Sequence, residues 1–285
     1  MNLVYAYSSY GLGDTLNTRA FLLAYCEQKP QAKSQTQVFT QFPEIFEGDG
    51  FIIKPGNPRI YREFFYRNFG NIMNIFKKYN IPKCDECLAK NAGIDFSFEQ
   101  IRLLNWKREE LDFTLPEKFV TINYGHDNNN YSNDNIVCLK MWSINYWETL
   151  VKMIGIPVVQ IGKGKYCKEI KGTALNLINK LSLKQSAEVL RRALFHIDIE
   201  GGLTILNQHL GGKSVVLFGP TDIKDKGRSF NLNLRHCNCN PCYEGEFSRR
   251  FSLYVPKKQL QCNNRCMTEL TPEYVVEQIH KNKWL

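Results

Sequence analysis

The chain has 285 residues, with 37 Lys or Arg against 28 Asp or Glu, which gives a net charge of +9. Hydrophobic residues make up 43% of the chain and charged residues 23%, which excludes a mainly disordered protein. No apolar run reaches the roughly 18 residues that a membrane-spanning helix needs, and no signal peptide is recognisable, so we expect a cytoplasmic protein with at most peripheral membrane contact.

The first part of the chain has the pattern of an α/β domain. Residues 3–7 are rich in β-formers and predict a strand, and a turn with two glycines follows it. We expect Asp14 to cap a helix that runs to about residue 25. Further strands are predicted at 38–39 and 51–53, and an aromatic helix at 58–79.

After a linker at 112–118, strands and helices alternate regularly. This alternation predicts a parallel sheet with helices on both faces. The strands are predicted at 119–123, 157–161, 195–199 and 214–218. The helices are expected to begin after Ser143, after the capping box of Ser182 with Gln185, after Gly201 and after Thr271, and a polar loop is expected at 124–135.

The length and the linker together predict two domains, residues 1–115 and 116–285, with a cleft between them. Because the net charge is +9 and the basic residues are scattered, a phosphate-bearing substrate suits the chain better than a nucleic-acid groove. A solvated surface explains any single basic doublet equally well.

The first candidate motif joins Gly11 and Gly13 to Asp14 directly after the first strand. Glycines let the backbone approach a ligand, and a helix N-terminus favours anions. Asp14 has two interpretations here: a general base that faces the cleft, or only a helix cap.

The second candidate follows the strand that carries His196 and Asp198. Strand alternation places these two side chains on the same face as Glu200. Gly201 and Gly202 then present backbone N–H groups at a helix start, which is a cradle for phosphate. A metal-binding acidic pair and an ordinary tight turn are the alternatives.

Lysines and glycines near other strand ends add to this candidate site. Lys140 lies just before a helix, from which it can reach a diphosphate, although a lone lysine is most often solvated. The strand at 157–161 ends in Gly162 and Lys163.

Ten cysteines in a chain without an export signal argue against disulfides. Two close pairs near the C-terminus have the spacing of a zinc-type site, whose role would be structural because four thiolates leave no open position. The alternative is four reduced thiols. Cys84 and Cys87 form another close pair, which we expect to be a loop feature. The predicted ligands are Cys239, Cys242, Cys262 and Cys266.

Taken together, these motifs resemble glycosyltransferase family 9, the ADP-heptose heptosyltransferases, and within it the branch that glycosylates autotransporter proteins and carries an iron-binding cysteine cluster. The resemblance extends over about residues 119–285. The segments that carry it are Gly11-Leu12-Gly13-Asp14, Lys140-Met141-Trp142, Glu200-Gly201-Gly202-Leu203, the run from Leu217 to Asp222, the cysteine pairs and Leu270-Thr271-Pro272-Glu273.

The resemblance implies two Rossmann-like domains in the GT-B arrangement and an inverting sugar transfer without a catalytic metal. The N-terminal domain would bind a glycan or protein acceptor, and Asp14 would be the catalytic base. The C-terminal domain would bind ADP-heptose and would carry the cysteine cluster, at 237–266, with structural iron or zinc. Glu200 stands where the family usually has Asp, and a homo-oligomer stays open. The nucleotide-sugar ligands would be Gly11, Gly13, Lys140, Gly162, Lys163, Glu200, Gly201, Gly202 and Leu203.

Two other functions compete with this hypothesis. One is a non-catalytic nucleic-acid binder with a zinc module, although no basic recognition helix with interleaved aromatics lies near the cysteines, so we expect no nucleic-acid partner. The other is a metal-dependent enzyme centred on His196, Asp198 and Glu200.

Overall fold

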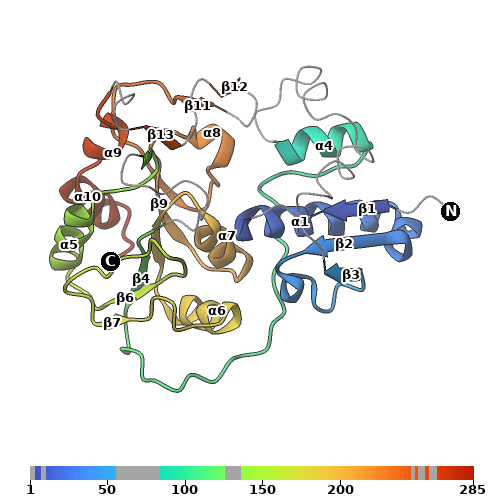
Figure 1. The fold of residues 1–285 in the computed structure, drawn as a ribbon, viewed down its shortest axis with the longest axis horizontal. Helices are drawn as coiled ribbons and strands as arrows, with labels where there is room; N and C mark the ends of the chain where they lie inside the picture. Colours follow the sequence, from blue (N-terminus) through green and yellow to red (C-terminus); the bar gives the residue numbers. More distant parts are fainter. Residues whose placement is uncertain are drawn as a thin grey trace. The chain divides into compact units, whose positions relative to one another are not determined.

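The computed structural model describes residues 4–7, 11–55, 84–125, 136–244, 248–249, 254–256 and 262–285. The helix predicted at 58–79 and most of the loop predicted at 124–135 lie outside these residues. The chain divides into two compact units between Asn105 and Trp106, whereas the sequence placed a boundary at 115. Each unit is a mixed α/β structure with a parallel sheet (Figure 1).

The first unit contains a three-stranded parallel sheet. Its strands β1 (Val4–Tyr7), β2 (Thr36–Thr40) and β3 (Ile52–Pro55) overlap the three strands predicted from the sequence, and they pair in chain order. Helix α1 (Leu12–Gln28) connects the first two strands and buries Leu16 and Ala20. Two short 3₁₀ helices, Pro30–Gln35 and Pro43–Phe46, complete the connections.

A buried ion pair fixes α1 within this unit. Arg19 is 4% exposed, and its Nε and Nη2 atoms donate to Asp49 at 2.7 and 2.9 Å. Its Nη1 atom donates to the carbonyl of Arg102 at 2.7 Å. Planar bidentate pairs of this kind are the strongest that Arg makes, so the helix is held at a defined place.

The prediction that Cys84 and Cys87 lie in a loop is wrong. Both residues belong to helix α4 (Cys84–Ala92), and Cys87 and Leu88 are fully buried. The helix is short and its apolar residues are few, so the periodic signal in the sequence is weak.

The second unit is built on a six-stranded, entirely parallel sheet. Its spatial order is β10-β9-β8-β4-β6-β7, so the chain starts in the middle and winds outwards in both directions. The order reverses between β4 and β8, which is where doubly wound sheets bind their ligands. The strands are β4 (Val120–Asn123), β6 (Val158–Ile161), β7 (Leu175–Asn176), β8 (His196–Ile199), β9 (Ser214–Leu217) and β10 (Leu232–Leu234).

Helices cover both faces of this sheet. Helices α5 (Ile144–Met153) and α10 (Pro272–Lys281) pack together on one face, and α6 (Leu183–Arg192) and α7 (Gly202–His209) on the other (Figure 1). The predicted capping box is present, because Ser182 accepts from the amide of Gln185 and the Gln185 side chain accepts in return. Thr271 likewise caps α10.

Smaller elements follow the sheet towards the C-terminus. Strand β5 (Ile136–Cys138) pairs in antiparallel fashion with β13 (Tyr254–Pro256), and β11 (Tyr243–Glu244) with β12 (Ser248–Arg249). Helices α8 (Ile223–Lys226) and α9 (Arg265–Thr268) are single turns. Among the described residues, no helix is long and apolar enough to cross a membrane.

Candidate active site

Two predicted residues come together at the carboxyl end of β8. Lys140, which lies between β5 and α5, forms an ion pair with Glu200, the residue after β8. Their side chains are only 14% and 15% exposed. Thr221 also donates to Glu200 from the turn after β9, at 3.4 Å. A lysine, a carboxylate and a hydroxyl from three separate segments thus meet at the switch point of the sheet, the usual place for ligands.

The electrostatics of Glu200 are set by its cations. Burial raises the pKa of its carboxyl, but the ammonium groups of Lys140 and Lys226 outweigh burial, and the pKa is lowered overall. Glu200 is therefore a carboxylate at neutral pH, with its charge balanced inside the site. Lys226 in α8 was not predicted as a site residue, because nothing in the sequence around it distinguishes it from other lysines.

The start of helix α7 lies next to this pair. Gly201 is its N-cap, and no side chain caps the helix. The amides of Gly202 and Leu203 in its first turn have no carbonyl of the same helix to bind, and the helix dipole is positive at this end. The geometry therefore suits an anionic group placed beside Lys140.

Gly162 is required by packing. Its φ is +145°, a region that L-residues avoid, and a Cβ there would lie 2.4 Å from the Asn123 Oδ1 atom. The turn that begins at Gly162 is also held by Asn179, whose amide donates to the Gly162 carbonyl at 2.9 Å and whose side chain accepts from Gly164. Lys163, on the same turn, is exposed. That Gly162 and Lys163 contact a nucleotide sugar stays a prediction.

His196 and Asp198 lie deeper in the sheet, away from Glu200's partners. The His196 Nε2 atom is 3.4 Å from Asp198 Oδ2, and its Nδ1 atom is 3.0 Å from the hydroxyl of Thr121. Asn123 donates to both Asp198 oxygens, at 3.1 and 3.3 Å, and the Ile199 amide donates at 2.7 Å. Burial raises the Asp198 pKa and outweighs these hydrogen bonds.

This arrangement weighs against the predicted alternative of a metal centre at His196, Asp198 and Glu200. Asp198 is directed to Asn123 and the backbone, while Glu200 is directed to Lys140. Within the described part of the chain, no group of three or more His, Cys, Asp or Glu side chains is arranged to hold a metal ion.

The third predicted centre, Asp14, lies in the first unit. Helix α1 begins before it, at Leu12, and Gly11 is the N-cap, so the interpretation of Asp14 as the cap is wrong. Asp14 is exposed in the first turn, with Gly13 buried beside it. A Cβ at Gly11 would lie 3.2 Å from its carboxylate, which is a tight contact. Asp14 is thus an accessible carboxylate on a glycine turn.

The four predicted metal ligands are cysteines close enough to influence one another electrostatically, but they are not arranged around a common point as metal ligands are. The pKa of Cys266 is raised to about 12, first by burial and then by the charges of Cys242, Cys239 and Cys237. The pKa of Cys242 is raised by burial and by Cys262 and Cys239. Thiols that influence one another suit iron or zinc as donor atoms. The predicted metal nevertheless stays a prediction, since no such group is arranged for an ion in the described residues.

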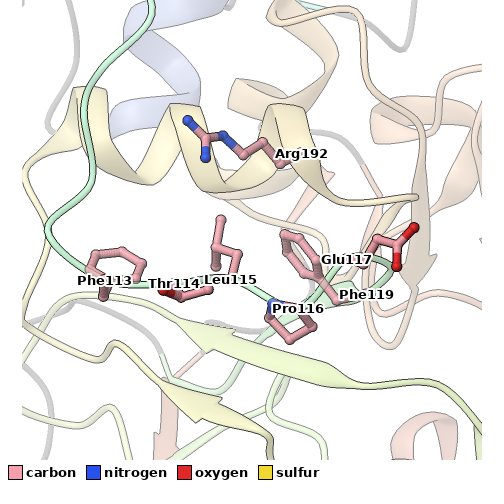
Figure 2. A pocket seen from close by; sticks show the side chains of 7 residues that line it. All are labelled: Phe113, Thr114, Leu115, Pro116, Glu117, Phe119 and Arg192. Carbon is pink, nitrogen blue, oxygen red and sulfur yellow. The ribbon is translucent and has the colours of Figure 1, made fainter.

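A cavity of the second unit lies at the opposite edge of its sheet. It has a volume of about 550 Å³ and is shaped by the segment that enters β4, with Arg192 from the end of α6 above it (Figure 2). Phe119 directly precedes β4, so this cavity is at the amino edge of the strands. It does not contain any predicted site residue. Its lining residues are Phe113, Thr114, Leu115, Pro116, Glu117, Phe119 and Arg192.

No protein-family model and no curated protein matches the sequence. Solved structures do match. The iron-containing dodecameric heptosyltransferase TibC, in complex with ADP-D-β-D-heptose, has a TM-score of 0.70 and 15% identity over 99% of this chain and 76% of its own. Another structure of TibC, from enterotoxigenic E. coli H10407, has a TM-score of 0.69 at 16% identity, covering 97% of this chain and 74% of its own.

Two further structures agree with these. E. coli heptosyltransferase WaaC with ADP has a TM-score of 0.55 and 15% identity, over 98% of this chain and 99% of its own. The glycosyl transferase family 9 protein from Veillonella parvula DSM 2008 has a TM-score of 0.58 and 10% identity, over 99% and 97%. The chain therefore has the fold of heptosyltransferases of glycosyltransferase family 9, and the resemblance seen in its motifs is confirmed for the fold.

Proposed function

We propose that the protein is an inverting glycosyltransferase that moves heptose from ADP-heptose to a hydroxyl group of a glycan or protein. The observation that carries the proposal is the Lys140–Glu200 pair, next to an uncapped helix start at the switch point of the sheet. It occurs in a fold shared with TibC in complex with ADP-D-β-D-heptose and with WaaC in complex with ADP. In this proposal the two units take the GT-B arrangement, and the reaction takes place in the cytoplasm.

The second unit binds the donor. The ammonium group of Lys140 and the amides of Gly202 and Leu203 hold the diphosphate, and they stabilise the charge that gathers on it as the sugar leaves. The Glu200 carboxylate accepts hydrogen bonds from sugar hydroxyls. Because Glu200 also pairs with Lys140, the cation is already in place before the donor arrives. Gly162, Lys163 and Gly201 complete the donor site.

The first unit binds the acceptor and supplies the base. The acceptor oxygen attacks the anomeric carbon of the donor, and the bond from that carbon to the diphosphate oxygen breaks. ADP leaves with the electron pair of that bond, and Asp14 takes the proton of the acceptor hydroxyl. Gly11 and Gly13 belong to the proposed nucleotide-sugar ligands, since glycines let a ligand approach the backbone beside this carboxylate. Attack from the side opposite the leaving group inverts the anomeric configuration.

The proposal is tested by titrating the protein with ADP and with ADP-heptose, and by measuring ADP release with candidate acceptors. Asp14→Asn should leave ADP affinity within about twofold and reduce turnover by roughly 10²–10⁴, the usual contribution of a general base. Asp95→Asn is the matched control, since Asp95 is exposed in the same unit and its hydrogen bonds to the described residues are made by its backbone. Full activity of Asp14→Asn would remove the base from the mechanism.

We also propose that Cys239, Cys242, Cys262 and Cys266 bind one structural iron or zinc ion. Their mutual electrostatic influence supports a shared site. Binding would require the four thiols to close around the ion, and its binding energy would add to folding energy. Elemental analysis of protein purified without added metal should find about one equivalent. Less than half an equivalent, with unchanged stability in Cys262→Ser, would refute the site.

A further inference from the structure

We propose that Arg235 is a positioning residue for the donor site: it ties the cysteine segment (residues 237–242 and 262–266) to the turn that supports Glu200. This inference rests on the proposed function, since it concerns the same donor site. Among the described residues, the side chain of Arg235 bonds to Gly219 and Cys239 and not to Lys140 or Glu200, so it is not a catalytic residue.

The guanidinium group of Arg235 joins two segments of main chain. Arg235 directly follows β10. Its Nε atom donates to the carbonyl of Gly219 at 3.2 Å, and its Nη2 atom donates to the carbonyl of Cys239 at 2.6 Å. The same Nη2 atom lies 3.5 Å from the Cys239 sulfur. A planar guanidinium can make these bonds together in a fixed geometry, which a lysine ammonium does not reproduce.

The Gly219 turn is in close contact with the second half of the cysteine segment. A Cβ at Gly219 would lie 2.3 Å from the sulfur of Met267 and 3.5 Å from that of Cys266. Both of these residues are buried and belong to the core of the second unit. The turn therefore lies on helix α9, and its carbonyl is directed to Arg235.

The Gly219–Asp222 turn supports Glu200. Two residues after Gly219, Thr221 is 1% exposed and donates its hydroxyl to Glu200 at 3.4 Å. Phe218, just before the turn, is fixed by the hydrogen bond that its backbone N–H donates to the Leu234 carbonyl at 2.8 Å. Movement at Gly219 is therefore transmitted to Thr221, because the strand before it cannot take up the shift.

The chain directly after the cysteine segment supports the other member of the pair, Lys140. The indole of Trp142, two residues after Lys140, donates to the Leu270 carbonyl at 2.7 Å. The Tyr146 hydroxyl donates to the carbonyl of Thr268, the last residue of α9, at 3.0 Å. The residues in and after the cysteine segment thus fix the chain next to Lys140 and Glu200. Arg235 joins residues 237–242 of that segment to the Gly219 turn.

The Arg235 bonds should contribute to nucleotide affinity through the Gly219–Asp222 turn. Loss of the Arg235 bonds should free the Gly219–Asp222 turn and disturb Thr221 and Glu200, while the sheet and its helices stay folded. A residue that served general stability would instead lower the unfolding temperature and raise hydrogen exchange throughout the second unit.

The test compares Arg235→Met with Arg265→Met. Arg265 lies in the same segment, is exposed and pairs with half-buried Glu269. Among the described residues, its side chain makes no hydrogen bond to the Gly219 turn. We expect Arg235→Met to weaken ADP binding roughly tenfold and to speed amide exchange at residues 218–222 in the absence of ligand. Arg265→Met should match the wild type in both measurements. Arg235→Lys should recover part of the affinity, and it replaces Arg235→Met if the latter does not fold.

The outcomes separate the inference from the function on which it rests. If the wild-type protein binds neither ADP nor ADP-heptose, the proposed function fails, and the exchange at residues 218–222 still tests the link. If the wild type binds ADP but Arg235→Met and Arg265→Met agree in affinity and in exchange, the inference is overturned. Faster exchange throughout the second unit, with a lower unfolding temperature, would also overturn it, since Arg235 would then be only structural.

Discussion

Asp198 and Glu200 stand two residues apart in the chain, and their surroundings give them opposite properties. Asp198 is 1% exposed, and its partners are His196, Asn123 and the Ile199 amide. Glu200 is just outside the strand and meets Lys140 and Thr221. The pKa is raised for Asp198 and lowered for Glu200.

The difference shows how the end of a parallel strand separates structure from function. Inside the strand, a carboxyl group is surrounded by the sheet, and its hydrogen bonds come from the neighbouring strand and from its own backbone. One step beyond, the same chemical group reaches a cation from another segment and remains open to a ligand. Alternation alone would give Asp198 and Glu200 the same role, whereas their partners assign one to packing and the other to the site.

The largest effect that sharpens this comparison is expected for Lys140→Met. Removal of the ammonium group takes away a charge that stabilises the leaving diphosphate, so turnover should fall by roughly 10²–10³. The stability should fall as well, because the largely buried Glu200 carboxylate loses the Lys140 ammonium and keeps only Lys226 and Thr221 beside it.

Steady-state kinetics and urea unfolding measure the two quantities separately. Lys152→Met is the matched control, since Lys152 is exposed in the last turn of α5, outside the site. If Lys140→Met loses stability and keeps its turnover, the assignment of this pair to function is wrong.

The next effect concerns stability. Asp198→Ala should lower the free energy of unfolding by about 3 kcal/mol, because the buried donors of Asn123 and Ile199 lose their acceptor. Asp198→Asn keeps the shape and one carbonyl oxygen, so its loss should be smaller. Urea unfolding gives both values. In both Asp198 variants, turnover per folded molecule should fall less than in Lys140→Met. A larger fall than in Lys140→Met would contradict the assignment of Asp198 to packing.

Much of the second unit was predictable because its signals are local. The Ser182–Gln185 capping box, the Thr271 cap and the apolar strands each depend on neighbours in the sequence, and each is present in the structure. Helix α4 was missed because nine residues carry little periodicity. Strand β5 was missed because its partner β13 is far along the chain, where only tertiary structure pairs them.

The site was predictable residue by residue but not as an arrangement. Lys140 and Glu200 were each singled out, yet their mutual ion pair depends on a distance that no spacing rule gives. Arg235 and Asn123 were missed altogether. The only signal for either is its place next to a strand end, and many polar residues share that place without a role.

The smallest effect is a change in how stability depends on pH. The Glu200 pKa lies below its ordinary value of 4.5 in the folded protein, so its contribution is complete above that value and is lost as the pH falls through the folded pKa. The Asp198 pKa lies above its ordinary value of 3.8, so its contribution is complete below that value and is lost as the pH rises through the folded pKa.

The two carboxyl groups therefore tilt the pH profile of stability in opposite directions. Relative to the wild type, Glu200→Gln should be more destabilised at neutral pH than in acid, because only the neutral-pH contribution of the ion pair is removed. Asp198→Asn should be more destabilised in acid than at neutral pH, because the wild type loses the Asp198 contribution as the pH rises, whereas an amide does not titrate. Urea unfolding of both variants and the wild type, from about pH 3.5 to 7.5, measures these differences. If both variants shift the profile in the same direction, Asp198 and Glu200 do not differ in the way that their partners indicate.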